Sequence, residues 1–356
     1  MIPIVMSADE NYAMPMCVAV HSILLNRTSD VHYCFYLLVP GAFSEAVSSK
    51  FDALAQMHQN FTISFVEMGD AFSMANIHIE HISVPTFYRL LAPDLLSQYD
   101  RCLYFDVDTV ICCDLSELYN IDIGENYLAG VRSPHFCTLS GKRRDDYLKT
   151  IGIDSLESYI NDGVLVMNLQ KMRDDGLTQK YLELAENNAL PGQSQLLNNV
   201  VCYGKIKLLE FRYNVQTKYW FYQDGILTER RALKAFSPYE LRTAIAFPYV
   251  IHFADHEKPW NYLNGFLYQE WWRYALSSPF AEDAWRGLIS ALTRYSKSEE
   301  KRLKTELRII RKSRAYRLGR FILYVPHNVN RGIQCLRDNG LKYTVKRIFQ
   351  KLRGID

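Results

Sequence analysis

Short apolar runs alternate with amphipathic stretches along the first third of the chain. Apolar runs of about four to eight residues predict buried strands, whereas apolar residues spaced by three and four predict helices. We therefore expect strands at residues 2–6, 33–39, 61–66, 102–105 and 110–113, and helical segments at 13–25, 44–56 and 85–91. This alternation predicts an α/β fold, in which helices flank a mostly parallel sheet.

The pattern becomes looser in the second third of the chain and changes character towards its end. A strand at 163–169 and a helix at 177–187 are still predicted. Residues 264–296 look helical and carry several large aromatic side chains, among them Trp271, Trp272, Tyr274 and Trp285. We see no internal repeat, so the chain is not predicted to be a repeat protein.

The charges divide the chain into an acidic body and a basic tail, although the whole sequence has a formal net charge of only +2. Residues 297–356 hold 17 Lys and Arg against 5 Asp and Glu, a net of +12, which leaves −10 on residues 1–296. With 48% hydrophobic residues, the chain can bury a sizeable core, which excludes wholesale disorder. We expect an α/β domain over 1–270, an aromatic helical extension over 271–296 and a basic amphipathic tail over 297–356.

The tail combines its charge with helical apolar periodicity. One helical face carries apolar side chains and its flanks carry cations: Leu341, Val345, Ile348 and Leu352, beside Lys342, Lys346, Arg347 and Lys351. Such a helix can bury its apolar face in lipid while its cations meet anionic headgroups, so we expect the tail to bind an anionic membrane surface. A packed helical extension or a dimerisation arm is the alternative. No nucleic-acid partner is expected, because no recognition motif accompanies the charge.

The sequence also indicates where the protein resides. No apolar run reaches the ~18–20 residues that a membrane-spanning helix needs. No secretory signal is visible after the first apolar run, so we expect a cytoplasmic protein, peripherally associated with the inner face of the cytoplasmic membrane. The eight cysteines contain no C-x-x-C pair, and we expect them to be reduced and mostly packed.

The sharpest chemical signal is a pair of carboxylates, Asp106 and Asp108, at the end of an apolar strand. Side chains two residues apart share one face of an extended chain, so the two carboxylates can converge. Ligands of open α/β sheets collect at the carboxyl ends of strands, where this pair would lie. Carboxylate oxygens with room for further ligands suit Mg²⁺ or Mn²⁺ bound to substrate phosphates.

Five segments of the chain together resemble family 8 glycosyltransferases, a group that includes bacterial lipopolysaccharide α-galactosyl- and α-glucosyltransferases and is related to glycogenin. The segments cover residues 6–12, 81–90, 104–108, 159–169 and 252–260, in the order found in that family. The resemblance implies a GT-A fold over residues 1–270 and retaining transfer of a hexose, galactose or glucose, from a UDP-sugar. It also implies Mn²⁺ as the cofactor, with Mg²⁺ as the alternative.

The resemblance assigns expected roles to individual residues. Asp106, Asp108 and His252 match the metal ligands. The other expected donor-binding residues are Ala8, Asp9, Asn11 and Tyr12 at the uracil and ribose, His81, Arg89 and Lys258 around the diphosphate and donor sugar, Asn161 and Gly163 on the sugar side, and Val107, Asp162 and Asp255 from the same segments. The candidate catalytic residues are Gln193, Ser194, Asn161 and Arg89.

The chain departs from the family pattern on the side of the sugars. The family's Asp-Gln-Asp-x-Leu-Asn stands here as 193–198, so that Gln193 replaces the first Asp and Ser194 replaces the Gln. A slip of one residue would instead keep Gln193 as that Gln, with Gly192 in the place of the Asp. Ser133 replaces an acceptor-side Asp, and Asp255 replaces a Gly. Sugar preference, acceptor choice and catalytic rate are the properties that these changes affect.

We therefore expect an enzyme that transfers a hexose to a saccharide acceptor of lipopolysaccharide or another surface glycan, free or linked to a lipid. Two alternatives remain open from the sequence. Asp106 and Asp108 partly fit a D-x-D-x-T phosphatase motif, although Thr109 stands one place early and the motif lies far from the first strand. The missing carboxylate at Gln193 would also fit an inactive module that binds nucleotide sugars.

Overall fold

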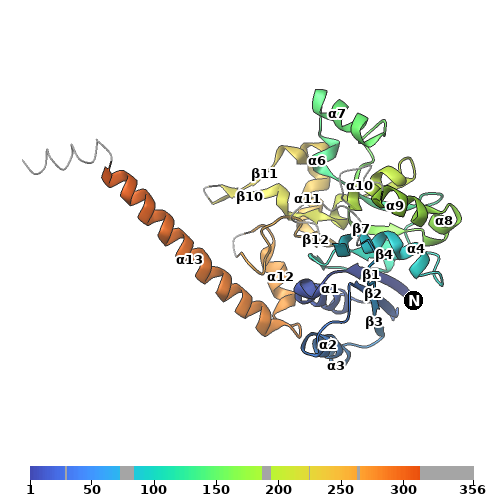
Figure 1. Ribbon diagram of the computed structural model, residues 1–356, viewed down its shortest axis with the longest axis horizontal. Helices are drawn as coiled ribbons and strands as arrows, with labels where there is room; N and C mark the ends of the chain where they lie inside the picture. Colours follow the sequence, from blue (N-terminus) through green and yellow to red (C-terminus); the bar gives the residue numbers. More distant parts are fainter. Residues whose placement is uncertain (29, 73–83, 187–193, 224, 263–264, 313–356) are drawn as a thin grey trace, which may run out of the picture. The chain divides into compact units, whose positions relative to one another are not determined.

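A seven-stranded mixed sheet forms the centre of the unit that spans residues 1–289 (Figure 1). The structure is a computed structural model, and it describes residues 1–312 except 29, 73–83, 187–193, 224 and 263–264. The strands lie in the order β3-β2-β1-β4-β7-β6-β8. They are β1 (Ile2–Ser7), β2 (Tyr33–Val39), β3 (Phe61–Glu67), β4 (Cys102–Phe105), β6 (Leu128–Arg132), β7 (Ile160–Met167) and β8 (Ile206–Leu209).

The sheet is parallel except for one strand. β7 runs antiparallel to both of its neighbours, β4 and β6, whereas all other neighbouring strands pair in parallel. The predicted α/β fold with a mostly parallel mixed sheet is therefore confirmed. The strand expected at 163–169 is β7, which begins earlier, at Ile160. Because β7 is antiparallel, its first half lies beside the carboxyl end of β4, where Val164 pairs with Phe105.

Both faces of the sheet are covered, which explains why its central strands are apolar throughout. Alternate residues of β1 pack on opposite sides: Ile4 joins the core with helix α1, and Val5 joins the core with helices α8 and α9. The α-helices are α1 (Ala13–Leu25), α2 (Glu45–Asp52), α3 (Leu54–Met57), α4 (Ala92–Leu95), α5 (Ser116–Tyr119), α6 (Pro134–Cys137), α7 (Gly141–Ile151), α8 (Leu169–Asp174), α9 (Leu177–Glu186), α10 (Ser194–Val201), α11 (Pro238–Ala246), α12 (Tyr268–Ala275) and α13 (Ala281–Lys312).

Two predicted helices differ in detail. The helix expected at 44–56 is divided at Ala53 into α2 and α3. The segment expected at 85–91 is a 3-10 helix, η2. The 3-10 segments are η1 (Glu10–Tyr12), η2 (Val84–Leu91), η3 (Phe211–Tyr213), η4 (Thr217–Tyr219) and η5 (Arg231–Ala235).

A second, three-stranded sheet lies beside the first and carries part of the candidate site. It consists of β5 (Thr109–Ile111), β12 (Val250–His252) and β9 (Val215–Gln216), in the order β5-β12-β9. β12 pairs antiparallel with β5 and parallel with β9. β10 (Trp220–Gln223) and β11 (Ile226–Glu229) form a separate antiparallel hairpin. The second sheet therefore brings three distant parts of the chain together.

The contacts divide the chain into two units, Met1–Ile289 and Ser290–Asp356. Within the first unit, Trp271 of α12 is fully buried and packs against Trp260. The predicted membrane-binding face of the tail, at 341–352, lies outside the described residues. Among the helices that the structure describes, none is both long and apolar enough to cross a membrane.

Candidate functional site

The two carboxylates of the D-x-D motif lie in a tight turn between β4 and β5. Asp106 follows Phe105, the last residue of β4, and Asp108 precedes Thr109, the first residue of β5. The backbone N–H of Asp106 donates to the carbonyl of Gly163 at 2.8 Å, and the Thr109 hydroxyl donates to the Asp106 carbonyl at 2.7 Å. These bonds hold the turn against β7.

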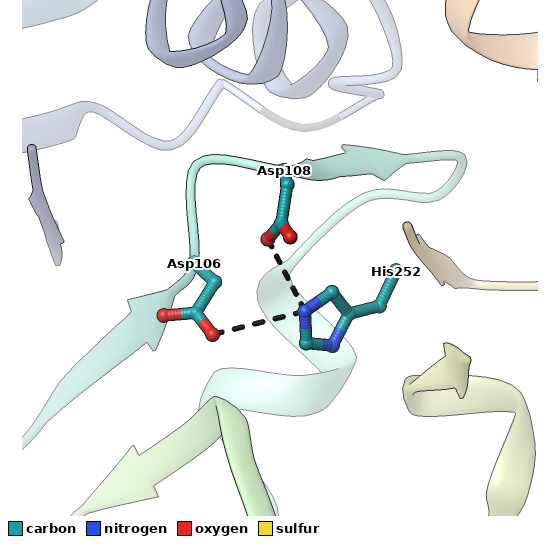
Figure 2. A group of neighbouring side chains, drawn as sticks. All are labelled: Asp106, Asp108 and His252. Carbon is teal, nitrogen blue, oxygen red and sulfur yellow. Dashed lines mark ion pairs between the residues drawn. The ribbon is translucent and has the colours of Figure 1, made fainter. Parts of the chain in front are cut away.

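His252 reaches the turn from the second sheet. It is the last residue of β12, and the pairing of β12 with β5 places it opposite Thr109. Its Nε2 lies 3.1 Å from Oδ1 of Asp108 and 3.7 Å from Oδ2 of Asp106 (Figure 2). One ligand atom from each of the three residues lies within 4.8 Å of the others. The fold therefore brings together the three side chains that the sequence indicated as metal ligands.

The residues of this cluster fit a divalent cation. Two carboxylate oxygens and one imidazole nitrogen are ligand types that divalent cations take in proteins. Gly163 lines the same space: a Cβ placed on it would lie 2.3 Å from Cε1 of His252 and 2.7 Å from Oδ2 of Asp106. Only glycine at this position leaves the imidazole and the carboxylate where they are.

The other nitrogen of the imidazole is held by an amide. Nδ1 of His252 lies 3.0 Å from Oδ1 of Asn214. The amide nitrogen of Asn214 donates to Oδ1 of Asn161 at 2.8 Å, and the same oxygen accepts the backbone N–H of Gly163 at 3.2 Å. His252 thus has one nitrogen bound to the protein and one that faces the two carboxylates.

Arg89 neutralises the other side of the cluster from inside the protein. Its guanidinium is buried, pairs with Asp106 at 2.7 Å and with Asp162 at 3.3 Å, and lies over the ring of Tyr104. Burial alone would lower the pKa of Arg89, but the carboxylates of Asp106 and Asp162 outweigh burial and raise it. The Tyr104 hydroxyl donates to Asp106 at 2.9 Å and lies 3.1 Å from the hydroxyl of Ser7.

Lys258 neutralises Asp108. Its Nζ lies 2.6 Å from Oδ2 of Asp108 and donates to the carbonyl of Phe253 at 2.7 Å. Burial would raise the pKa of Asp108, but Lys258 and the hydrogen bonds from Lys258 and His252 outweigh burial and lower it. Asp108 is therefore ionised, as a metal ligand must be.

Asp162 lies behind Arg89 and contacts the segment that departs from the family pattern. It accepts hydrogen bonds from Ser194 at 3.3 Å and from Asn198 at 3.2 Å. Burial raises the pKa of Asp162, although Arg89 opposes this shift. Gln195 accepts a hydrogen bond from Asn161 at 2.9 Å. Gln193 and His81, which the sequence also indicated, lie outside the described residues.

The segment expected to hold uracil and ribose follows β1, the neighbour of β4. Ala8 is buried and donates its backbone N–H to the carbonyl of Leu38. The Asp9 carboxylate accepts the backbone N–H of Asn11 at 3.0 Å and so caps η1. Tyr12 is 40% exposed and packs edge-on against Trp260. The neighbouring strands place this segment at the same sheet edge as Asp106.

The two remaining donor-binding candidates have side chains with other partners. Val107 lies between the two aspartates, but its side chain is buried in the core that includes α1. It therefore offers a ligand its backbone and not its side chain. The carboxylate of Asp255 accepts the backbone N–H of His256 at 2.8 Å and lies beside the imidazole of the same residue.

Three polar residues near the cluster were not indicated by the sequence. Asn214 contacts His252, Gln216 pairs with His252 across β9 and β12, and Lys218 follows two positions later. Both amide atoms of Gln216 are buried and have no hydrogen-bond partner among the described residues. Burial lowers the pKa of Lys218. The only signal in the sequence is the alternation of polar and apolar residues at 213–216, which is too short to assign a strand.

Solved structures with known function share this architecture. A galactosyltransferase, LgtC, solved in complex with donor and acceptor sugar analogues, matches with a TM-score of 0.65 and 25% identity over 81% of this chain and 100% of that chain. A bifunctional glycosyltransferase, WbbM, matches with a TM-score of 0.66 and 23% identity over 81% of this chain and 52% of that chain. The expected GT-A fold is therefore confirmed.

Relatives are also found by sequence. Glycosyltransferase GlyE of Streptococcus pneumoniae is 31% identical over 56% of this chain and 43% of its own length. Lipopolysaccharide 1,2-glucosyltransferase of Escherichia coli K12 is 24% identical over 80% of each chain. The chain matches less than two thirds of GlyE and also of a Haemophilus influenzae relative, of which 62% is covered at 30% identity. The model of glycosyl transferase family 8 matches residues 3–264, and the chain therefore belongs to glycosyltransferase family 8.

Proposed function

We propose that the protein is a retaining hexosyltransferase that uses a UDP-sugar and Mn²⁺ and forms an α-glycosidic bond. The observation that carries this proposal is the cluster of Asp106, Asp108 and His252, which Lys258 and Arg89 adjoin from two sides. Such a cluster of anionic ligands and cations matches the charge pattern of a nucleoside diphosphate bound through a metal. Family membership supports the proposal and gives no support to the phosphatase alternative.

The metal would be held by Asp106, Asp108 and His252, and when bound it would neutralise charge on the departing diphosphate. Lys258 adds a cation at the same place, since its Nζ already lies 2.6 Å from Asp108. Electrostatic stabilisation of a leaving group requires such fixed charges, because they need no reorganisation during the reaction. Mn²⁺ is proposed over Mg²⁺ because the set contains an imidazole.

The remaining residues take the positions around the donor. We assign Ala8, Asp9, Asn11 and Tyr12 to the nucleoside, since they follow β1 at the sheet edge next to β4. Arg89 fixes Asp106 and Asp162 in place, and Gly163 provides the space at the metal. His81, Asn161, Asp162, Val107 and Asp255 remain candidates for the diphosphate and the donor sugar. Gln193, Ser194, Asn161 and Arg89 remain the candidates for the catalytic role.

The proposed donor sugar is galactose or glucose, and the proposed acceptor is a saccharide of lipopolysaccharide or another surface glycan. Two relatives support this choice by their names, a galactosyltransferase and a lipopolysaccharide 1,2-glucosyltransferase. An acceptor linked to lipid would lie at the cytoplasmic leaflet. Membrane association through residues 297–356, with a net charge of +12, would place the enzyme there.

The test is a donor screen that measures UDP release with and without Mn²⁺. UDP-glucose, UDP-galactose and their N-acetylated forms are compared, each with the full-length protein. Turnover of one hexose donor, dependent on Mn²⁺, is the expected result. Turnover of none of them, together with measurable UDP-sugar binding, would favour the inactive module, which the missing carboxylate at Gln193 motivates.

A further inference from the structure

A row of buried hydrogen bonds connects the backbone of β7 to the imidazole of His252. It runs from the N–H of Gly163 to Oδ1 of Asn161 at 3.2 Å, from Nδ2 of Asn214 to the same oxygen at 2.8 Å, and from Oδ1 of Asn214 to Nδ1 of His252 at 3.0 Å. Asn161, Asn214 and His252 are at most 7% exposed. Water therefore does not compete for these bonds, and each polar atom depends on its protein partner.

The direction of every bond in this row follows from its first member. A backbone N–H can only donate, so the oxygen of the Asn161 amide must face Gly163. The nitrogen of that amide then donates to Gln195, at 2.9 Å. Because the Asn161 oxygen can only accept, Asn214 must offer it the NH₂ group, and the Asn214 oxygen must face His252. Two acceptors do not form a hydrogen bond, so Nδ1 of His252 carries a proton.

A neutral imidazole with its proton on Nδ1 has its lone pair on Nε2. In this structure Nε2 is the atom that faces Asp108 and Asp106, at 3.1 and 3.7 Å. Asp108 and Asn214 therefore compete for the proton of a neutral imidazole in the metal-free protein, whereas a cation between the three ligands would take the lone pair of Nε2 and leave the proton on Nδ1. Histidines that bind metals generally donate their other N–H to a carbonyl or carboxylate, which fixes the tautomer and the ring orientation. Asn214 supplies that acceptor here.

We propose that Asn214 is the positioning residue of the metal site: its side-chain carbonyl holds His252 in the Nδ1–H tautomer and aims Nε2 at the cation. The inference rests on the proposed function for the existence of a bound metal. It goes beyond the proposed function because Asn214 is not one of the three proposed metal ligands and lies outside the segments that the sequence indicated.

The second sheet explains how Asn214 arrives at this position. Its backbone N–H donates to the carbonyl of Phe211 at 3.0 Å, which closes the 3-10 turn η3 directly before β9. The next residue, Val215, pairs with Ile251, the residue before His252. On the other side of the ring Gly163 leaves no room for displacement, because a Cβ there would overlap Cε1. The imidazole is thus held between a glycine backbone and an amide.

The experiment compares two replacements of Asn214 in the full-length protein. Asn214→Leu keeps the approximate size but removes the acceptor. Asn214→Asp keeps an acceptor for Nδ1–H and removes the donor to Asn161. Asn199→Leu is the matched control, because Asn199 is equally buried and bonds the backbone of Ile160 without contact to His252.

Calorimetric titration of the metal-free protein with MnCl₂ gives the first readout. We expect Asn214→Leu to weaken Mn²⁺ binding by about 10- to 100-fold, as other outer ligand partners do, and Asn214→Asp to rescue most of this loss. Asn199→Leu should lower the unfolding midpoint without weakening Mn²⁺ binding. Wild-type affinity in a folded Asn214→Leu protein would overturn the proposal. So would an equal loss of affinity in Asn199→Leu.

Long-range ¹H–¹⁵N NMR of histidine-labelled, metal-free protein gives the second readout, with His252 assigned by its loss in His252→Gln. At a pH where the imidazole is neutral, the wild type should show the Nδ1–H tautomer and Asn214→Leu should not. A wild-type Nε2–H tautomer overturns the inference even if Mn²⁺ binds. A wild type with the Nδ1–H tautomer that binds no Mn²⁺ contradicts the proposed metal site and not the role of Asn214 in fixing the tautomer.

Discussion

Gly163 lies directly against the imidazole of His252, so that a Cβ on the glycine would come within 2.3 Å of Cε1. The ring cannot move aside freely, because Asn214 holds its Nδ1. We therefore expect Gly163→Ala to displace His252 and weaken Mn²⁺ binding by roughly the 10- to 100-fold of a disturbed ligand shell. Calorimetric titration with MnCl₂ measures this. Gly287→Ala, on a helix where a Cβ meets no atom within 4 Å, is the control and should leave binding unchanged.

Replacement of either motif aspartate should abolish metal-dependent turnover. Asp106→Ala or Asp108→Ala removes one of three ligands, and the loss should approach about 10³-fold because a bound metal supplies several kcal/mol. UDP release from the preferred UDP-sugar, with and without Mn²⁺, measures the effect. Asp154→Ala, on an exposed bend, is the matched control. Full activity in either motif variant would contradict the metal assignment.

Loss of Arg89 should destabilise the fold and not only the site. Arg89→Met leaves Asp106 and Asp162 without their buried cation, which should lower the free energy of unfolding by about 3–5 kcal/mol. Urea denaturation measures this. The double variant Arg89→Met/Asp162→Asn removes one of the two unpaired charges and should recover part of the stability. If the double variant recovers no stability, the unpaired charge of Asp162 is not the cause of the loss in Arg89→Met.

A pair of histidines, of which His21 is buried, should make the protein sensitive to mild acid. His21 of α1 is fully buried, with Nε2 3.0 Å from the Ser277 hydroxyl and Nδ1 2.9 Å from Nε2 of His58. Burial lowers the pKa of His21 to about 4, with His58 adding to the shift. Below pH 6.5, the ordinary pKa of histidine, the His21 imidazole of the unfolded chain binds a proton, whereas that of the folded protein stays neutral down to about pH 4.

Stability should therefore fall by up to about 3 kcal/mol as the pH drops from about 6.5 to about 4, and change little from this source above that range. Urea denaturation at several pH values tests this. His21→Gln should flatten the dependence, whereas His256→Gln, which alters an exposed imidazole, should not. An unchanged slope in His21→Gln would contradict the assignment.

The basic tail should control attachment to anionic vesicles. Truncation after Ser296 should release the protein from phosphatidylserine-containing liposomes while UDP binding persists, because the removed residues carry a net charge of +12. Co-sedimentation measures the attachment. A full-length variant with four cations replaced by Glu should also co-sediment less with the liposomes; the replaced residues are Lys342, Lys346, Arg347 and Lys351. Sedimentation that neither change reduces would exclude the tail as the anchor.

The sequence by itself determined those elements whose pattern is local and strong. The bounds of α1, β2 and β4 were predicted as the structure has them. The two strands are buried on both faces of the sheet and are therefore continuous apolar runs, and the helix shows apolar residues at helical spacing. The pair Asp106 and Asp108 was also visible, since two carboxylates after an apolar strand stand out. The family followed from segments that together extend from residue 6 to residue 260.

Only the tertiary structure decided how these parts meet. The reversed direction of β7 brings Gly163 to the end of β4, and the pairing of β12 with β5 and β9 brings His252 and Asn214 to Asp108. Strand direction and pairing depend on contacts between distant segments of the chain. The local sequence of a short strand does not show which partner it pairs with or in which direction it runs. The D-x-D motif could therefore be recognised in the sequence, whereas the contact of the Asn214 amide with His252 became apparent only in the fold.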